Sequence, residues 1–163
     1  MKIGIAADHA GQGLQRAVSE HLRAKGHSVV PFGDPPRPDD DYPLIVAPLA
    51  EAVARGDVDR AIFMCGSGIG PSVAANKIPG VRAAVVTDEW SARDAVEHVD
   101  VNLLALGERV IGSELAKSIV DAYLDAEVQG GRHARRREQI RELERAGRTT
   151  EAVVLKRSKG APT

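Results

Sequence analysis

Residues 61–77 read AIFMCGSGIGPSVAANK, and this stretch decides the fold of the chain. The apolar run Ala61–Met64 has the length and composition of a short buried strand. The three glycines of CGSGIG, residues 65–70, permit a tight turn whose backbone N–H groups converge on one point. A helix predicted over Ser72–Ile78 adds the partial positive charge of its N-terminus there. Cys65, the only cysteine, lies where the strand ends and the turn begins.

By itself, this turn favours a site for a small anion, whether catalytic or not. Its spacing is not that of the G-x-G-x-x-G dinucleotide fingerprint, and no G-K-[ST] follows as in a P-loop. A single buried cysteine is most often a small apolar side chain. An acid–base side chain beside an anion-stabilising turn is nevertheless the composition of an active site.

The chain has 163 residues, of which 43% are hydrophobic, and a net charge of −1. These values predict one folded domain with a real core and give no reason to expect nucleic acid as a partner. One cysteine cannot form an internal disulfide, which fits a reducing compartment. The sequence shows no signal peptide and no apolar run that would span a membrane, so we expect a cytoplasmic protein.

Strand-like and helix-like segments alternate along the whole chain. This alternation is typical of a parallel sheet covered by helices on both faces. A loop rich in proline and aspartate, residues 33–41, interrupts it after the second strand. The pattern predicts strands over 3–7, 28–32, 61–64, 81–86 and 102–106, and helices over 14–24, 43–54, 72–78, 88–97, 112–128 and 132–145.

In such sheets a ligand lies beyond the carboxyl ends of the strands. This rule selects the polar side chains that follow strands one, three and four: Asp8 and His9, Cys65 and Ser67, and Thr87 and Asp88. His98 directly precedes strand five, in a loop that could lie at either edge of the sheet.

Seven short motifs occur in order with preserved spacing over roughly residues 1–145. Together they resemble the type B ribose-5-phosphate isomerases, which are relatives of the galactose-6-phosphate and allose-6-phosphate isomerases. The motifs are DHAG at 8–11, DYP at 41–43, CGSGIG at 65–70, AANK at 74–77, NLLALG at 102–107, RV at 109–110 and GGRH at 130–133.

The resemblance implies a Rossmann-like, single-domain α/β/α sandwich with a five-stranded parallel sheet in the order 2-1-3-5-4. It implies a homodimer whose active sites are shared between the subunits, and it leaves a tetramer open. No metal and no organic cofactor are implied, and neither nucleic acid nor a membrane is an implied partner. The isomerase domain would span residues 1–147, followed by an extension over 148–163 to which we assign no role.

The reaction implied by the resemblance interconverts an aldose phosphate and a ketose phosphate through an enediolate. Removing the weakly acidic C2 proton requires a base near the carbon and donors aimed at the oxygen that becomes negative. By resemblance, Cys65 takes the proton and returns it to the neighbouring carbon, and the N–H groups of residues 67–70 are the donors. Part of the family uses a glutamate just after the glycine turn, where this chain has Pro71.

Sugars in solution are mostly cyclic, so the ring must open before the proton moves. By resemblance, Asp8 and His98 handle the hydroxyl proton in that step, and Ser67 lies near the migrating oxygen-bound proton. The residues alone leave a second interpretation of His98 open, that of a surface histidine stabilised by a helix dipole.

The phosphate group requires cations. By resemblance, His9, Arg132 and Arg136 bind it and Arg109 lies near the site, and a one-turn spacing places Arg132 and Arg136 on one helix face. The sequence alone also fits a solvated basic face. The remaining substrate-binding positions implied by the resemblance are Tyr42, Gly66, Gly68, Ile69, Gly70 and Val99.

One departure from the family pattern is important, whereas Pro71 and the proline-rich loop at 35–38 are lesser variations. The family usually has His-Asn-Asp around the ring-opening histidine, whereas this chain has His98-Val99-Asp100. Because the missing asparagine normally helps to hold sugar oxygens near the enediolate, the substitution leaves open a tetrose, a hexose, or a deoxy or branched sugar phosphate as substrate.

Two other classes of function remain as alternatives. A non-catalytic phosphosugar-binding protein would keep the fold without the reaction, although the chain retains the residues implied for catalysis. A nucleotide-binding regulator is disfavoured, because the only acidic residue directly after strand two is Asp34, in the proline-rich loop.

Overall fold

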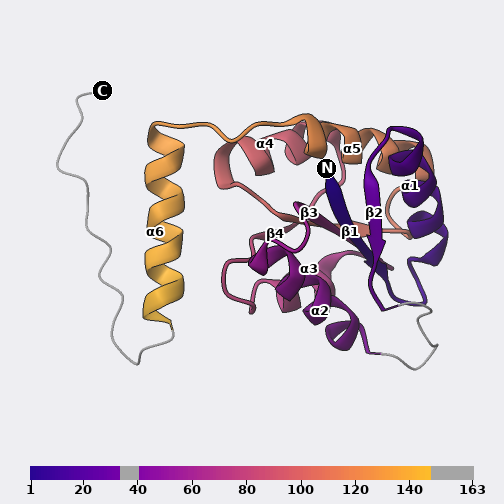
Figure 1. The fold of residues 1–163 in the computed structure, drawn as a ribbon, viewed down its shortest axis with the longest axis horizontal. Coiled ribbons are helices and arrows are strands. Elements are labelled where there is room, and N and C mark those ends of the chain that lie inside the picture. Colours follow the sequence, from indigo (N-terminus) through magenta and orange to yellow (C-terminus); the bar gives the residue numbers. More distant parts are fainter. Residues whose placement is uncertain (34–40, 148–163) are drawn as a thin grey trace.

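The computed structural model describes residues 1–33 and 41–147 (Figure 1). Residues 34–40, which include most of the proline-rich loop, and the extension at 148–163 lie outside the described residues. In the described part no helix is long and apolar enough to cross a membrane.

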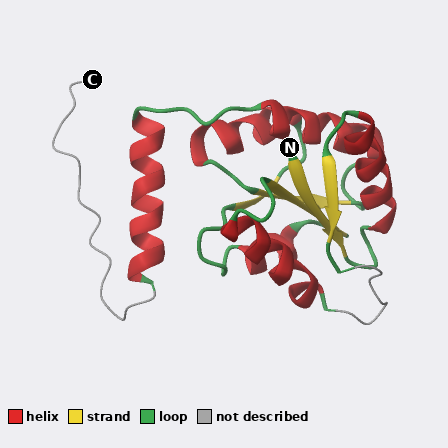
Figure 2. Ribbon diagram, in the orientation of Figure 1, coloured by secondary structure: helices red, strands yellow, loops and turns green. Residues whose placement is uncertain are grey.

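Five parallel strands form one sheet in the order β2-β1-β3-β5-β4, which confirms the predicted fold (Figure 2). Six helices accompany them in the described residues. The strands are β1 (Lys2–Ala7), β2 (Ser28–Pro31), β3 (Arg60–Cys65), β4 (Ala83–Val85) and β5 (Leu103–Gly107), and the helices are α1 (Gln12–Ala24), α2 (Tyr42–Arg55), α3 (Ile69–Ala75), α4 (Glu89–Val99), α5 (Ser113–Asp125) and α6 (Arg132–Ala146).

Two hydrophobic clusters cover the two faces of the sheet. Helices α1, α4 and α5 pack on one face with Ile62 and Leu104, and α2 and α3 pack on the other with Phe63 and Leu103. Successive strand residues point to opposite faces. The central strand β3 is therefore buried on both sides, as its continuous apolar sequence predicts.

Helix α3 begins at Ile69, three residues before the predicted start at Ser72. The reason is Gly68, whose φ of 82° lets the chain enter the helix directly from the turn. Pro71 is accommodated because the first turn of a helix needs no N–H donor. The helix ends before the predicted Ile78, because the Asn76 side chain bonds to the backbone of Ala83 instead of continuing the helix.

Two other elements are shorter than predicted. Strand β4 excludes Arg82, because the backbone N–H of Arg82 donates to the Asn102 side chain. Helix α5 ends at Asp125 rather than Val128, because the Arg60 guanidinium binds the carbonyls of Tyr123 and Ala126 at its C-terminus.

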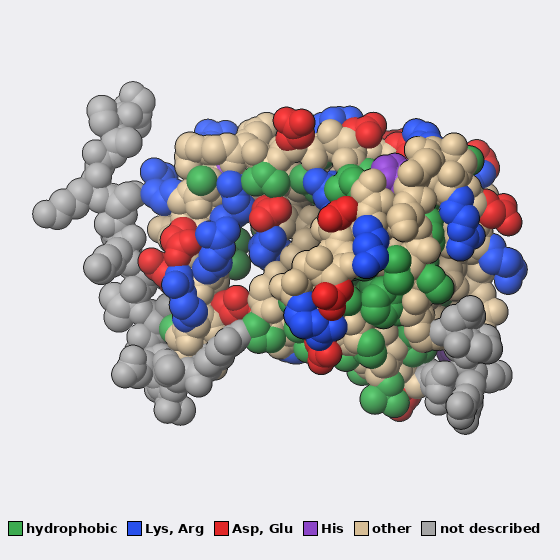
Figure 3. Space-filling model, in the orientation of Figure 1, with side chains coloured by type: hydrophobic (Ala, Val, Ile, Leu, Met, Phe, Trp, Pro, Cys, Tyr) green, Lys and Arg blue, Asp and Glu red, His purple; other side chains and the backbone are tan. Residues whose placement is uncertain are grey.

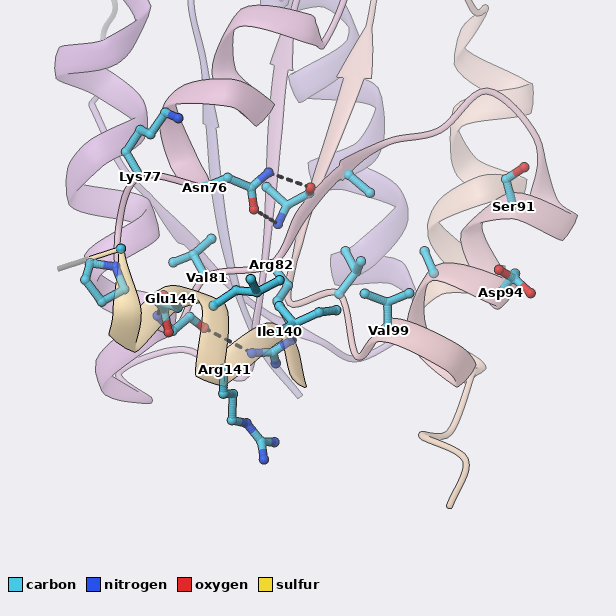
Figure 4. Close-up of a pocket in the computed structure, with 18 of the residues that line it drawn as sticks. Asn76, Lys77, Val81, Arg82, Ser91, Asp94, Val99, Ile140, Arg141 and Glu144 are labelled. Atoms are coloured by element: carbon cyan, nitrogen blue, oxygen red, sulfur yellow. Dashed lines mark hydrogen bonds between the residues drawn. The ribbon is translucent and has the colours of Figure 1, made fainter. Parts of the chain in front are cut away.

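Helix α6 stands apart from the sandwich (Figure 1). It contacts the α4 end of the body through its first turns, and near its other end Glu144 accepts a hydrogen bond of 2.7 Å from the Gly80 N–H. Between these attachments runs a groove of about 860 Å³, lined by apolar side chains that include Val81, Val99 and Ile140 (Figure 4).

Tyr123 generates a prediction about stability. Its side chain is fully buried, its hydroxyl has no hydrogen-bond partner among the described residues, and burial raises its pKa above the usual value. Removing an unsatisfied buried hydroxyl relieves a desolvation penalty, so Tyr123→Phe should raise the free energy of unfolding by about 1 kcal/mol. Chemical denaturation measures this free energy, with Tyr42→Phe at an exposed tyrosine as a control that should leave it unchanged. A lower free energy of unfolding for Tyr123→Phe would contradict the prediction.

Candidate active site

Three loops meet at the carboxyl edge of the sheet, after β1, β3 and β5. The Asp8 N–H donates to the Met64 carbonyl at 3.2 Å, and the Glu108 N–H donates to the Cys65 carbonyl at 2.8 Å. The loops after β1 and β5 are thus tied to the end of β3, the strand that lies between them. These bonds place Asp8 and Arg109 on either side of Cys65.

Two glycines allow the loops to approach this closely. A Cβ on Gly107 would lie 2.7–2.9 Å from the backbone of Ser67, and a Cβ on Gly11 would lie 2.7 Å from the Cys65 nitrogen. No side chain fits at either position without a shift of the backbone. Gly107 belongs to the NLLALG motif and Gly11 to DHAG, so close packing accounts for both glycines.

The Cys65 thiol is held inside the glycine turn. Its Sγ accepts a hydrogen bond of 3.0 Å from the Gly68 N–H, and its side chain is only 5% exposed. The Ile69 N–H donates to Ser67 Oγ at 3.3 Å. Two of the four predicted N–H donors of the turn therefore bind the predicted catalytic side chains in this structure.

Asp8 is the second buried polar group at this edge. Its carboxylate accepts a hydrogen bond of 2.8 Å from the Ala10 N–H, and the residue is 8% exposed. The following His9 is exposed. The DHAG motif thus presents one fixed carboxylate and one solvent-facing imidazole beside the glycine turn.

Arg109 and Tyr42 lie against two of the turn glycines. The Arg109 guanidinium is 3.4–3.5 Å from the position of a Cβ on Gly66, and the Tyr42 ring is 2.7–3.0 Å from that of a Cβ on Gly70. The structure therefore brings together ten of the predicted site residues: Asp8, His9, Tyr42, Cys65, Gly66, Ser67, Gly68, Ile69, Gly70 and Arg109.

The other four predicted residues lie elsewhere. His98 and Val99 form the end of α4, not a loop as predicted. Helix α4 starts at the carboxyl edge after β4 and returns to the amino edge, where β5 starts. Its 11 residues span about 16 Å at about 1.5 Å per residue. His98 therefore lies at the opposite edge of the sheet from Cys65.

Arg132 and Arg136 accompany His98, because the start of α6 packs there. The imidazole of His133 stacks on that of His98, with ring centroids 3.9 Å apart and an interplanar angle of 12°. Arg132 Nε donates to His133 Nε2 at 3.1 Å. Burial, His98 and the neighbouring arginines lower the pKa of His133. A neutral His133 fits both the stacking and the bond from Arg132.

The arginines of α6 divide into two groups. Arg141 and Arg145 pair with Glu138, as expected of a solvated helix face. Within the described residues, no carboxylate forms an ion pair with Arg132 or Arg136. These two cations are therefore available to an anion. Figure 3 shows basic side chains along this helix with acidic ones among them.

Sequence reasoning assigned no role to four residues that shape these two groups, although one of them, His133, lies in the GGRH motif. Glu108 accepts a hydrogen bond of 3.0 Å from the Leu14 N–H and so ties α1 to the loop after β5. The other three surround His98. Asp94 Oδ1 lies 2.5 Å from His98 Nδ1, the His133 ring stacks on the His98 ring, and Arg137 donates to the His98 carbonyl at 3.3 Å. The position of Glu108 after β5 and the one-turn spacing of Asp94 and His98 were available signals. No sequence signal indicated Arg137.

The profile of a family described as Ribose/Galactose Isomerase matches residues 3–140 of this sequence. The chain belongs to this family. Among the described residues, no three His, Cys, Asp or Glu side chains are grouped to hold a metal ion.

Individual relatives agree with the family. The isomerase is 45% identical over 143 residues to ribose-5-phosphate isomerase B of Escherichia coli (strain K12), covering 88% of this chain and 96% of that protein. It is 41% identical over 141 residues to D-erythrulose-4-phosphate isomerase of Pectobacterium atrosepticum, covering 86% of this chain and 93% of that protein. A solved structure of Clostridium thermocellum ribose-5-phosphate isomerase B matches with a TM-score of 0.87 and 50% identity, covering 90% of this chain and 99% of that one.

These relationships establish the class of reaction. The isomerase is an aldose–ketose isomerase that acts on a phosphorylated sugar. The resemblance drawn from the seven sequence motifs is confirmed.

The contact between Gly107 and Ser67 gives a prediction for this site. Gly107→Ala should lower both the melting temperature and the activity, because the new methyl group must displace the glycine turn that holds Cys65. Gly112→Ala is a matched control, since nothing lies within 4 Å of its Cβ position and its φ of −80° suits any residue. Thermal unfolding and turnover are measured for both variants. Equal behaviour of the two would show that the turn tolerates the shift.

Proposed function

We propose that this isomerase moves a proton between C2 and C1 of an open-chain sugar phosphate, with Cys65 as the base and an enediolate as the intermediate. The observation that carries the proposal is the buried Cys65 thiol, held at 3.0 Å by the Gly68 N–H beside the buried Asp8 carboxylate. The thiolate is the form of a cysteine that removes a proton, and the Gly68 N–H is placed to donate to the sulfur. Part of the family has a glutamate base at the position of Pro71, so in this chain no glutamate at that position can take the place of Cys65.

A complete site requires two chains. Cys65 and Asp8 lie at one edge of the sheet and His98, Arg132 and Arg136 at the other, so the two groups do not meet within one chain. In a homodimer, one protomer supplies the first group and its partner supplies the second. The apolar groove beside α6 and the exposed apolar side chains of Ile69, Val73 and Trp90 support such an interface.

The cations of the second group suit a phosphate dianion. Arg132 and Arg136 project from the same face of α6 and form no ion pair with the described carboxylates, and planar guanidinium groups bind phosphate through two hydrogen bonds at once. His9 and Arg109 add positive or donor groups from the first protomer. The phosphate would then hold the two protomers' contributions together in the bound state.

Ribose 5-phosphate is the substrate that we propose first, because both the E. coli relative and the C. thermocellum structure are named for it. Val99 keeps a tetrose phosphate as the alternative, and the Pectobacterium relative is named for D-erythrulose 4-phosphate. A coupled assay on phosphorylated tetroses, pentoses and hexoses decides between them. If none of these sugar phosphates is turned over, the alternative of a non-catalytic phosphosugar-binding protein is favoured.

The shared site predicts complementation between two inactive variants. Cys65→Ser and His98→Asn should each lose nearly all turnover, because one lacks the base and the other the ring-opening imidazole. After mixing and subunit exchange, half of the dimers are mixed and each carries one intact site, so about a quarter of wild-type activity should return. The Cys65→Ser/His98→Asn double variant mixed with wild type is the control for exchange. A mixed dimer of these two chains has no intact site, so exchange lowers the activity of the mixture. No recovery, with exchange demonstrated, would place both residues in a site formed by a single chain.

The phosphate contacts predict a selective effect on binding. Arg136→Ala should raise KM roughly 10- to 100-fold, because a charge-assisted hydrogen bond is worth about 1.5–3 kcal/mol. Arg135→Ala, on the neighbouring position of the same helix, should leave KM unchanged. Steady-state kinetics on the phosphorylated sugar and on free ribose test this. Efficient turnover of free ribose by the wild type would remove the role of the arginines.

Val99 predicts a change of substrate preference. Val99→Asn should raise kcat/KM for ribose 5-phosphate, because an amide donor near the developing negative charge can be worth about 2.7–4 kcal/mol in the transition state. Val99 also packs partly against the core, so Val99→Ala serves as the control for lost packing. Both variants and the wild type are compared on tetrose, pentose and hexose phosphates. An unchanged substrate ranking would show that Val99 does not select the sugar.

A further inference from the structure

We propose that Asp94 is a positioning residue for His98: it holds a hydrogen on Nδ1, so that Nε2 is the nitrogen that exchanges a proton with the sugar. The inference rests on the function proposed above, in which His98 takes part in opening the sugar ring. It concerns a residue outside all seven sequence motifs.

The distance between the two side chains fixes the hydrogen. Asp94 precedes His98 by one turn of α4, and its Oδ1 lies 2.5 Å from His98 Nδ1. A carboxylate has only lone pairs to offer, and two lone pairs repel each other at this separation. Nδ1 must therefore carry the hydrogen. In the neutral ring, Nε2 is then left with a lone pair.

Neighbouring groups hold the plane of the ring. His133 stacks on one face at 3.9 Å, and the buried Arg137 donates to the His98 carbonyl at 3.3 Å and to the Gln129 carbonyl at 2.8 Å. No described residue hydrogen-bonds to Nε2 of His98. Asp94 thus holds Nδ1, His133 covers one face of the ring, and Arg137 fixes the backbone of His98. The Nε2 edge is left for a ligand.

Ring opening shows why a fixed tautomer matters. The proton of the anomeric hydroxyl passes to Nε2 while the bond between C1 and the ring oxygen breaks. The electron pair of that bond goes to the ring oxygen, which takes a proton from a water molecule. The hydroxide so formed then takes the proton from His98, and ring closure reverses these transfers. During the step His98 becomes an imidazolium, and the Asp94 carboxylate beside Nδ1 stabilises that charge. A ring with its hydrogen on Nε2 has no lone pair to accept the proton.

A purely structural role for Asp94 is the competing explanation. An acid and a histidine one turn apart also stabilise a helix, and both side chains are about one-third exposed, at 31% and 33%. Both roles fix the tautomer of His98, but only the positioning role acts selectively on substrates that must open a ring. The tautomer and this selectivity can each be measured.

The first test observes the tautomer by nitrogen-15 NMR of the histidine rings of the full-length protein at a pH where His98 is neutral. The His98→Gln spectrum identifies the His98 signals among the five histidines. We expect the Nδ1–H form in the wild type, a shift toward Nε2–H in Asp94→Ala, and restoration in Asp94→Glu. A wild-type ring in the Nε2–H form, or an unchanged tautomer in Asp94→Ala, would overturn the proposal.

The second test compares two substrates. Ribose 5-phosphate closes into a five-membered ring, whereas erythrose 4-phosphate cannot, because its O4 carries the phosphate. Asp94→Asn should lower kcat for ribose 5-phosphate about 10- to 100-fold with little change in KM, and leave kcat for erythrose 4-phosphate nearly unchanged. The control is Glu97→Gln on the same helix as Asp94: it loses a carboxylate that accepts a hydrogen bond from the Gln129 side chain, and it should match the wild type on both substrates.

The outcomes separate the two proposals. If the wild type turns over no sugar phosphate, the proposed function fails, and the tautomer measurement alone then reports whether Asp94 holds His98. If the wild type is active and Asp94→Asn slows both substrates equally, the ring-opening role fails. Thermal unfolding of each variant is recorded beside the kinetics, because a structural role would lower the melting temperature and affect both substrates alike.

Discussion

The hydrogen bonds that join the ends of β1, β3 and β5 are the constraint on which the rest of the structure depends. Because these three strands are adjacent and parallel, their carboxyl ends lie side by side, and the bonds from Asp8 to Met64 and from Glu108 to Cys65 lock the following loops together. A buried carboxylate, a buried thiol and a guanidinium are thereby held in one place by backbone geometry. Little of this arrangement depends on flexible side chains, which suits a reaction in which a proton moves between neighbouring carbons.

The same topology excludes His98 from that edge. A helix that connects parallel strands must return to the amino edge before the next strand begins, so the end of α4 lies away from the end of β3. The stacked His98 and His133 rings form a second polar group with Arg132 and Arg136, which pair with no carboxylate of the described residues. The division of the site between two copies that we propose is consistent with this connection rule of the sheet.

Much of this could be predicted from the sequence, and the failures have identifiable causes. The alternating pattern gave the elements and the sheet, and the strand ends gave Asp8 and Cys65, because burial and periodicity are local properties of the chain. The start of α3 was misplaced because Gly68 enters the helix through a left-handed conformation, which composition does not reveal. The edge occupied by His98 was left open because it depends on where α4 ends. Arg137 was missed because a buried arginine bound to two carbonyls has no periodic signal.

The two groups of site residues differ in how freely their sequences can change. At the Cys65 edge, Gly11 and Gly107 lie against backbone, so a larger residue at either position must move a strand end or the turn. At the His98 edge, Val99 and Asp94 line an open groove, where a new side chain meets solvent or a partner rather than packed backbone. Substitutions that alter sugar selection or the state of His98 therefore cost less stability on α4 than substitutions around Cys65. Val99, which departs from the pattern that the resemblance implies, lies on that freer element, and Asp94 lies one turn before His98 on the same helix.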